Sequence, residues 1–170
     1  KAYEDFIAVA EDLVNRGITK PRHLGIKGGS NGGLLTGVAF THRPDLFNAV
    51  VCQVPLLDMK RYTKLLAGHS WIAEYGDPDQ PEIWKFWKNW SPYHNVIKAK
   101  KYPTVLFTTS TKDDRVHPGH ARKMVARMKA QGHPVLYYEN IEGGHAGAAN
   151  LKQRAYGNAL AYSYLLQQLK

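Results

Sequence analysis

The chain has 170 residues, of which 44% are hydrophobic and 22% charged, and 23 Lys and Arg outnumber 14 Asp and Glu for a net charge of +9. This length suits one domain, and the balance of apolar and charged residues excludes both a wholly disordered chain and a bundle of membrane helices. Apart from one dense run at Lys98–Lys101, the basic residues are interleaved with apolar ones, so we expect no nucleic-acid partner. No stretch approaches the roughly 18 consecutive apolar residues of a membrane span, so we expect no membrane partner. The single Cys52 excludes an intramolecular disulfide and a cysteine-based metal site. We see no signal peptide and leave the compartment open between cytoplasm and periplasm.

Helical and strand patterns alternate along the chain. Apolar residues at helical spacing predict a helix over residues 3–16, which Gly17 ends. A short strand over 23–27 leads into a helix over 31–41. Later apolar runs predict strands over residues 48–54, 103–109 and 135–139, with helices near 118–131 and 150–169. This order predicts an α/β fold with about four parallel strands and helices on both faces.

Residues 56–100 interrupt the alternation. The segment is long, aromatic and punctuated by prolines, so we expect it to cross the C-terminal edge of the sheet. Within it, Trp84, Trp87 and Trp90 are spaced by three, with Phe86 beside them, and this spacing favours the buried face of a helix over a ligand platform.

A glycine-rich turn between the first strand and the following helix carries the strongest motif. Gly28, Ser30 and Gly32 fit the pattern G-x-S-x-G, in which a sharp turn projects the serine hydroxyl above the sheet. We expect Gly29 and Gly32 to leave room for that turn. The alternative is a structural turn in which Ser30 is the N-cap of the helix. In the catalytic interpretation, Ser30 is a nucleophile and needs a histidine base.

His145 is the favoured base, because it lies in a flexible Gly-Gly-His-Ala-Gly loop directly after the last strand. His117 and His120 flank Pro118 at a helix start, where capping or solvent exposure is expected. A metal site formed by these three histidines lacks a completing carboxylate or cysteine, so we predict no metal. The remaining five histidines are assigned structural roles: His23, His42, His69, His94 and His133.

The carboxylate that would hold the base should also follow a strand. Asp113 and Asp114 come directly after the third strand, between the serine and the histidine in chain order, and either fits. Their structural alternative is an N-cap and a first-turn acid of the next helix. Asp58 follows the second strand, one crossover too early.

Six ordered landmarks across the whole chain resemble the catalytic domain of the prolyl oligopeptidase family. They are Gly28–Leu35, Arg43–Phe47, Gly68–Trp71 with Tyr75–Gly76, Ser91–Val96, Asp113–Val116 and Gly144–His145. The family consists of α/β-hydrolase serine peptidases that cleave short peptides, in one branch after proline. The resemblance implies a partial α/β-hydrolase fold and no cofactor.

The resemblance also assigns roles to individual residues. Ser30 matches the nucleophile, His145 the base, and Asp113, the first acid of Asp-Asp-Arg-Val, the triad acid. The amide of Asn31 matches an oxyanion donor, and Arg115 matches an arginine that binds a substrate carbonyl.

The substrate-binding residues follow from the same resemblance. Trp71 matches an indole that stacks on the substrate's proline ring, although core packing is its structural alternative. Tyr75, Val116 and Leu56 fall where the family lines its first specificity pocket. Leu56 stands where a smaller residue is common, so we expect a narrower pocket.

The resemblance further implies that residues 1–170 are the C-terminal part of a peptidase catalytic domain. Upstream strands, a tyrosine that supplies a second oxyanion donor and an N-terminal propeller are expected outside this chain. The first strand would then have an open edge through which the chain can self-associate.

We therefore predict a serine peptidase that hydrolyses short peptides after proline by a Ser-His-Asp acyl-enzyme mechanism. Two alternatives remain. One is an esterase or an acylaminoacyl or dipeptidyl exopeptidase of the same fold. The other is a catalytically incomplete fragment that acts only as a folding or assembly unit.

Overall fold

The computed structural model describes all 170 residues and contains one parallel sheet of four strands in the order β1-β2-β3-β4. The strands are β1 (Gly25–Gly29), β2 (Ala49–Gln53), β3 (Val105–Ser110) and β4 (Val135–Asn140). Their register pairs Gly25 with Ala49, Val50 with Val105, and Val105 with Val135. The predicted α/β fold with four parallel strands is confirmed.

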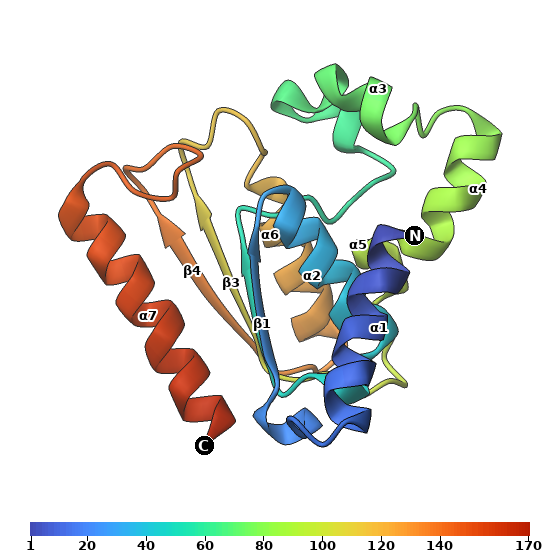
Figure 1. Ribbon diagram of the computed structural model, residues 1–170. Coiled ribbons are helices and arrows are strands. Elements are labelled where there is room, and N and C mark those ends of the chain that lie inside the picture. The colour runs from blue at the N-terminus through green and yellow to red at the C-terminus, as the bar shows by residue number, and fades with distance from the viewer.

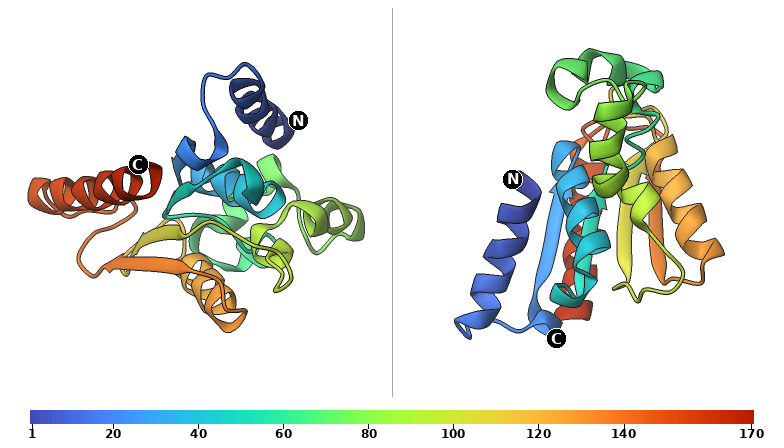
Figure 2. Two further views of the ribbon diagram at one scale, coloured as in Figure 1. Left: turned by 90° about the horizontal axis from the view of Figure 1, so that it is seen from below. Right: turned by 90° about the vertical axis from the view of Figure 1, so that its right-hand side faces the viewer.

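Helices cover both faces of the sheet (Figure 1). One face carries α2 (Asn31–His42) and α6 (Gly119–Ala130), with α1 (Ala2–Asn15) packed outside α2. The other face carries α7 (Leu151–Leu169), which stands apart from the remaining helices in the left view of Figure 2. The result is a three-layered α/β/α arrangement.

The alternation of side chains along the strands explains the two apolar layers. Val50 and Cys52 of β2 face the cluster that contains residues of α2 and α6, whereas Ala49 and Val51 face Tyr164 and other residues of α7. Every residue of β3 is buried, as expected for a central strand covered on both sides. β1 and β4 form the two edges of the sheet and are less buried.

The first strand differs from its predicted limits. The prediction placed it over residues 23–27, but Pro21–His23 form a turn of 3-10 helix (η1), and β1 starts two residues later and includes both glycines before Ser30. Proline fixes the backbone for the first position of such a turn, and pattern alone does not reveal it. β1 pairs on one side only, with β2, so its other edge is free in this chain. Self-association through that edge stays a prediction.

Residues 56–100 cross the C-terminal ends of the strands, as predicted (Figure 1). They form short helical segments rather than strands: η3 (Tyr62–Lys64), η4 (Leu66–Trp71), α3 (Ile72–Tyr75), α4 (Pro81–Trp90) and α5 (Pro92–Asn95). On α4, Trp87 is 2% exposed and Trp84 and Trp90 are partly buried, which confirms the predicted buried face, whereas Phe86 is 51% exposed.

A buried ionic cluster anchors the start of this crossing segment. The carboxylate of Asp58 is fully buried and bonds Lys123 of α6 and Arg61. Burial alone would raise the pKa of Asp58, but Lys123, then His94 and Arg61, outweigh it and bring the pKa below its usual value. Asp58 therefore ties the segment after β2 to α6 and is not placed with Ser30.

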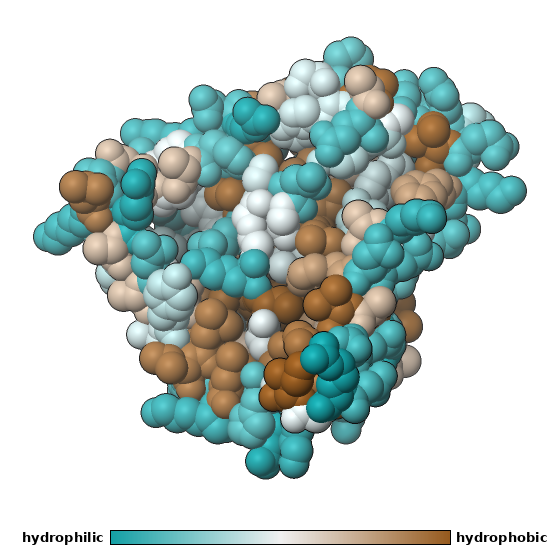
Figure 3. Space-filling view, viewed as in Figure 1, coloured by the Kyte–Doolittle hydropathy of each residue, from teal (hydrophilic) through white to brown (hydrophobic).

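In the view of Figure 3, hydrophobic residues gather in the lower half of the face, between α7 and α1 and over β1. None of the helices has both the length and the apolar character that crossing a bilayer requires.

Candidate active site

The candidate nucleophile Ser30 lies on the sharp turn between β1 and α2. Its backbone has φ 59° and ψ −117°, a strained conformation for a residue with a side chain. The Ser30 amide donates to the carbonyl of Gln53 at 3.0 Å, and its own carbonyl accepts from Leu34 at 3.1 Å. These two bonds fix the turn between the sheet and the helix. Ser30 occupies the N-cap position without a capping side-chain bond, so its hydroxyl is free for another partner.

The glycines that this turn requires are not the ones predicted. A side chain on Gly28 would meet the carbonyl oxygen of Gly32 at 2.2 Å, and one on Gly33 would meet Pro55 at 2.7 Å. In contrast, Gly32 has open space around it, and Gly29 has only ordinary contacts. The prediction of Gly29 and Gly32 was wrong, because the sequence does not show that the first turn of α2 folds back over Gly28.

His145 contacts Ser30 from a loop that is 115 residues away in sequence. Its Nε2 lies 3.1 Å from Ser30 Oγ. Its Nδ1 lies 2.9 Å from Oδ2 and 3.1 Å from Oδ1 of Asp113. Because a carboxylate accepts hydrogen bonds, this contact favours the tautomer with the proton on Nδ1, which leaves Nε2 free to accept from the serine hydroxyl.

Asp113 is held in place by the backbone of its own loop. The carboxylate is fully buried, and Oδ1 accepts from the amides of Arg115 at 2.9 Å and Val116 at 2.8 Å. Asp114, the sequence alternative, is exposed to solvent. The structure therefore brings Ser30, His145 and Asp113 together from three separate loops at the C-terminal edge of the sheet.

Asn31 is the first residue of α2, where backbone amides have no partner within the helix. The helix N-terminus also carries partial positive charge, so this amide suits an anionic oxygen beside Ser30. The Asn31 side chain accepts from the hydroxyl of Tyr75 at 2.9 Å. Burial, followed by the charge of Glu74, raises the pKa of Tyr75, so this hydroxyl stays protonated as a donor.

The other expected substrate-binding residues gather in one apolar cluster. Leu56 and Val116, each 2% exposed, belong to its buried part, and Trp71 and Tyr75 pack against it. The guanidinium carbon of the exposed Arg115 lies 6.0 Å from the centre of the Trp71 ring. Leu56 and Val116 are thus packed inside the cluster, whereas Trp71 retains an accessible surface beside Arg115.

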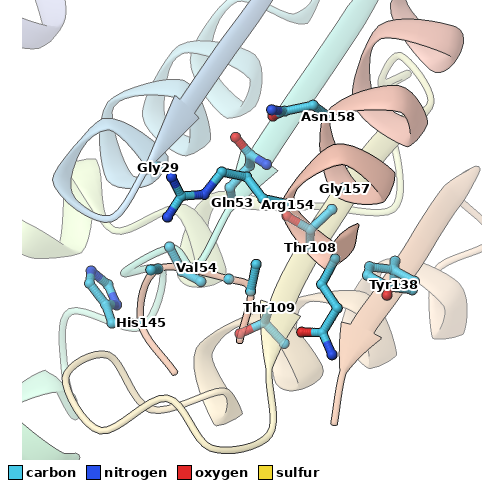
Figure 4. A pocket seen from close by; sticks show the side chains of 14 residues that line it. Gly29, Gln53, Val54, Thr108, Thr109, Tyr138, His145, Arg154, Gly157 and Asn158 are labelled. Carbon is cyan, nitrogen blue, oxygen red and sulfur yellow. The ribbon is translucent and has the colours of Figure 1, made fainter. Parts of the chain in front are cut away.

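A cavity of about 160 Å³ opens beside His145, between the strand ends and α7 (Figure 4). Gly29, Thr108 and Asn158 are among its lining residues, and the Arg154 side chain extends across it toward Gly29. His145 and Ala146 also line the cavity, so it lies on the His145 side of the site.

The remaining histidines of the metal hypothesis lie elsewhere. His120 is buried under the segment after β2, where its Nδ1 accepts from the amides of Leu57 and Asp58. His117 Nδ1 accepts from the amide of Gly119 at 2.9 Å, which is a capping contact. No group of three or more metal-ligating side chains is present.

Sequence reasoning missed two residues that shape the His145 loop, Asn140 and Gln153. Asn140 is the last residue of β4 and is 5% exposed, with its side chain bonded to several loop atoms. A polar residue directly before a glycine-rich loop is the signal that marks such a position.

The chain is similar in sequence and in structure to known proteins. The whole chain, residues 1–170, matches the sequence profile of the prolyl oligopeptidase family. It is 58% identical over 169 residues to the uncharacterized peptidase y4nA of Sinorhizobium fredii. The aligned region covers 99% of this chain and 23% of that peptidase. It is 37% identical to the prolyl endopeptidase of Elizabethkingia miricola, covering 98% of this chain and 24% of the relative. A solved structure of a post-proline cleaving enzyme from Rickettsia typhi superposes with a TM-score of 0.90 at 44% identity, covering 99% of this chain and 25% of that one. The chain thus spans about a quarter of the length of these relatives.

Proposed function

The chain belongs to the prolyl oligopeptidase family, and we propose that the polypeptide carrying it is a serine peptidase that cleaves short peptides after proline. The observation that carries this proposal is the alignment of Ser30 Oγ, His145 Nε2 at 3.1 Å, and Asp113, whose Oδ2 lies 2.9 Å from the other ring nitrogen. Side chains from three loops, two of them rich in glycine, meet in the order that acyl transfer requires.

The proposed reaction proceeds through an acyl-enzyme. Ser30 attacks the scissile carbonyl while His145 accepts the hydroxyl proton, and His145 then returns that proton to the leaving amine. Asp113 keeps the imidazole in the required tautomer and stabilises its charged form. Water, activated by His145 in the same way, then releases the acyl group from Ser30.

The amide of Asn31 is proposed to stabilise the negative oxygen that forms during the attack. Its place at the start of α2 supports this role, because an unpaired amide at a helix N-terminus favours negative charge. Arg115 is proposed to bind a substrate carbonyl, and its exposed guanidinium beside the Trp71 ring supports that assignment.

Selectivity for proline is proposed to come from Trp71. A flat indole suits the rigid proline ring, and Trp71 packs against the cluster that contains Leu56, Val116 and Tyr75. Two relatives support the substrate class by name, the prolyl endopeptidase of Elizabethkingia miricola and the post-proline cleaving enzyme of Rickettsia typhi.

The nucleophile is tested with a fluorophosphonate probe on the full polypeptide. We expect Ser30 to be labelled, and the Ser30→Ala variant to lose both labelling and roughly 10⁴-fold or more in peptide turnover. Equal labelling of native protein and Ser30→Ala would refute the proposed nucleophile.

The substrate class is tested with a chromogenic Gly-Pro substrate and a simple ester. Trp71→Ala should lower kcat/KM for the Gly-Pro substrate by about 10- to 100-fold, since losing an apolar contact with one ring is worth about 1–3 kcal/mol. Ester turnover should be unchanged. Trp84→Ala is the matched control, because Trp84 packs against the same apolar cluster as Trp71, but its ring contacts His94 rather than Arg115. An unchanged kcat/KM for Trp71→Ala would favour an esterase or an exopeptidase that does not select proline.

A further inference from the structure

We propose that Asn140 is a positioning residue that fixes the loop presenting His145, acting together with Gln153 of α7. The inference rests on the proposed function of His145 as a base and concerns how the fold holds that base within reach of Ser30. The position of this base must be exact, because a displacement of about 1 Å in an active site can lower the rate about 100-fold.

The loop that carries His145 has little structure of its own. It connects β4 to α7, contains neither helix nor strand, and includes Gly143, Gly144 and Gly147. Ile141, its first residue, is 70% exposed, so apolar packing does not anchor this end of the loop. A glycine-rich loop has high conformational entropy, and hydrogen bonds must therefore select the conformation in which His145 faces Ser30.

The Asn140 side chain bonds the loop on both sides of His145. Its Oδ1 accepts from the amides of Glu142 at 3.0 Å and Gly143 at 3.3 Å, which closes a turn before the histidine. Its Nδ2 donates to the carbonyl of Gly147 at 3.0 Å, after the histidine, and to Oε1 of Gln153 at 3.0 Å. The amide thus uses both acceptor sites and both donors, and it is 5% exposed.

Gln153, in the first turn of α7, adds further hydrogen bonds to the loop. We call the side-chain hydrogen bonds of Asn140 and Gln153 together the Asn140 clamp. The Oε1 atom of Gln153 also accepts from the amide of Ala149 at 2.7 Å, and its Nε2 donates to the Glu142 carboxylate. Its backbone amide donates to Asn150, the N-cap of α7, at 3.0 Å. Both ends of the loop are therefore tied to the start of one helix through the Asn140–Gln153 pair.

Asn140 also connects the base with its acid. The Asn140 carbonyl accepts from the amide of Thr111 at 2.8 Å, on the segment that leads from β3 to Asp113. Residue 140 therefore contacts the two loops that carry His145 and Asp113, while its side chain touches neither catalytic group directly. This is the arrangement expected of a residue that positions a base rather than one that reacts.

The chemistry of the side chain allows a graded test. Asn140→Asp keeps the acceptors for Glu142 and Gly143 but loses both donors and places negative charge against the Gly147 carbonyl. Asn140→Ala loses all four bonds. Gln153→Ala removes the partner on α7 and leaves Asn140 in place. The exposed Asn89 of α4 provides the matched control, Asn89→Ala.

The experiment measures kcat and KM for a proline-containing peptide, the melting temperature, and hydrogen exchange of residues 141–149 in the full polypeptide. We expect Asn140→Ala to lower kcat by about 10- to 100-fold with KM within about 2-fold, because the residues proposed to bind substrate lie on other segments. Asn140→Asp and Gln153→Ala should fall between Asn140→Ala and the native protein, with exchange of the loop amides rising in the same order. Asn89→Ala should behave as native.

Several outcomes overturn the proposal. A native kcat in Asn140→Ala refutes it, and so does a loss that appears in KM alone or that only parallels a fall in melting temperature. If Asn140→Ala fails to fold, Gln153→Ala and Asn140→Asp decide the question, and unchanged kcat and loop exchange in both would refute it. If the native polypeptide neither turns over peptide nor labels at Ser30, the proposed function fails instead. Loop exchange in the variants then decides separately whether Asn140 holds the loop.

Discussion

His120 makes the segment after β2 sensitive to acid. The side chain is 1% exposed, and Nδ1 accepts from the amides of Leu57 at 3.2 Å and Asp58 at 3.1 Å. Burial lowers the pKa of His120 from 6.5 to about 4; the Asp58 charge opposes this shift, whereas Lys123 and His117 add to it. Protonation of Nδ1 would leave two buried amides facing a charged donor, so the folded segment requires the neutral ring.

The sign of the pH dependence follows from proton counting. Between pH 6.5 and 4 the opened segment binds a proton at His120 that the closed segment excludes, so acid favours opening. The contribution of His120 is complete above about pH 6.5 and is lost as the pH falls toward 4. From these two pKa values, opening of the segment becomes easier by about 2 kcal/mol, or ~20-fold, between pH 7 and pH 5.

Hydrogen exchange of a peptide that contains Leu57 and Asp58 measures this opening directly in the full polypeptide. After correction for the intrinsic exchange rate, the protection of these amides should fall about 20-fold from pH 7 to pH 5. In His120→Asn the side-chain oxygen can take the place of Nδ1 without titrating, so most of the pH dependence should disappear.

The test compares the pH dependence of protection in the native protein with that in His120→Asn. His94, which also faces Asp58, has a pKa lowered mainly by burial, and it contributes in the same direction in both proteins. Only the difference between native protein and His120→Asn therefore reports on His120. If both lose protection equally between pH 7 and pH 5, the reasoning about the buried imidazole is wrong.

Three further substitutions or treatments test other parts of the structure. Gly28→Ala places a methyl group 2.2 Å from the Gly32 carbonyl oxygen and should lower both the melting temperature and kcat. Gly32→Ala is the control, because Gly32 has open space around it, and both quantities should stay near native. Equal effects of the two substitutions would contradict the geometry of the turn. The Cys52 thiol is buried, and burial raises its pKa to about 12. We therefore expect Cys52 to resist alkylation at pH 8 until the protein is unfolded, as measured by peptide mapping. Rapid alkylation of Cys52 in the folded protein would exclude this packing. Tyr75→Phe removes the 2.9 Å hydrogen bond to Asn31 and should change kcat by only a few-fold, since one hydrogen bond contributes about 0.5–1.5 kcal/mol net. A fall in kcat of more than about 100-fold would instead assign the Tyr75 hydroxyl a direct role in catalysis.

The order of elements could be predicted because it depends on local pattern. Strand β2 and the first half of β3 are apolar runs, and segments of helix length follow the strands. The predicted limits of β2, β3, α2, α6 and α7 therefore agree with the structure to within about two residues. The start of β1 was misplaced because η1 is a turn stabilised by proline rather than by apolar pattern. Elements that depend on periodicity were visible, whereas a turn set by one residue was not.

The types of residue in the candidate site were also visible in the sequence. A serine between glycines after a strand and a histidine in a glycine-rich loop each indicate their chemistry locally. The resemblance to a family, not spacing, distinguished Asp113 from Asp114. The physical difference appears only in the structure, where Asp113 turns inward onto the amides of Arg115 and Val116 while Asp114 is exposed.

The sequence by itself determined the parallel α/β layering, and it marked Ser30, His145 and the pair Asp113 and Asp114 as candidates, because strand patterns and short motifs are local properties. The resemblance to a family then selected Asp113. Only the tertiary structure shows which contacts hold the three side chains of the candidate site in position. The 3.1 Å contact between Ser30 and His145 joins residues 115 positions apart, and its geometry depends on the close approach of Gly28 to Gly32 and on the Asn140 clamp. Such contacts arise from packing between distant segments, and their geometry is set at the scale of tenths of an ångström, which no local pattern encodes.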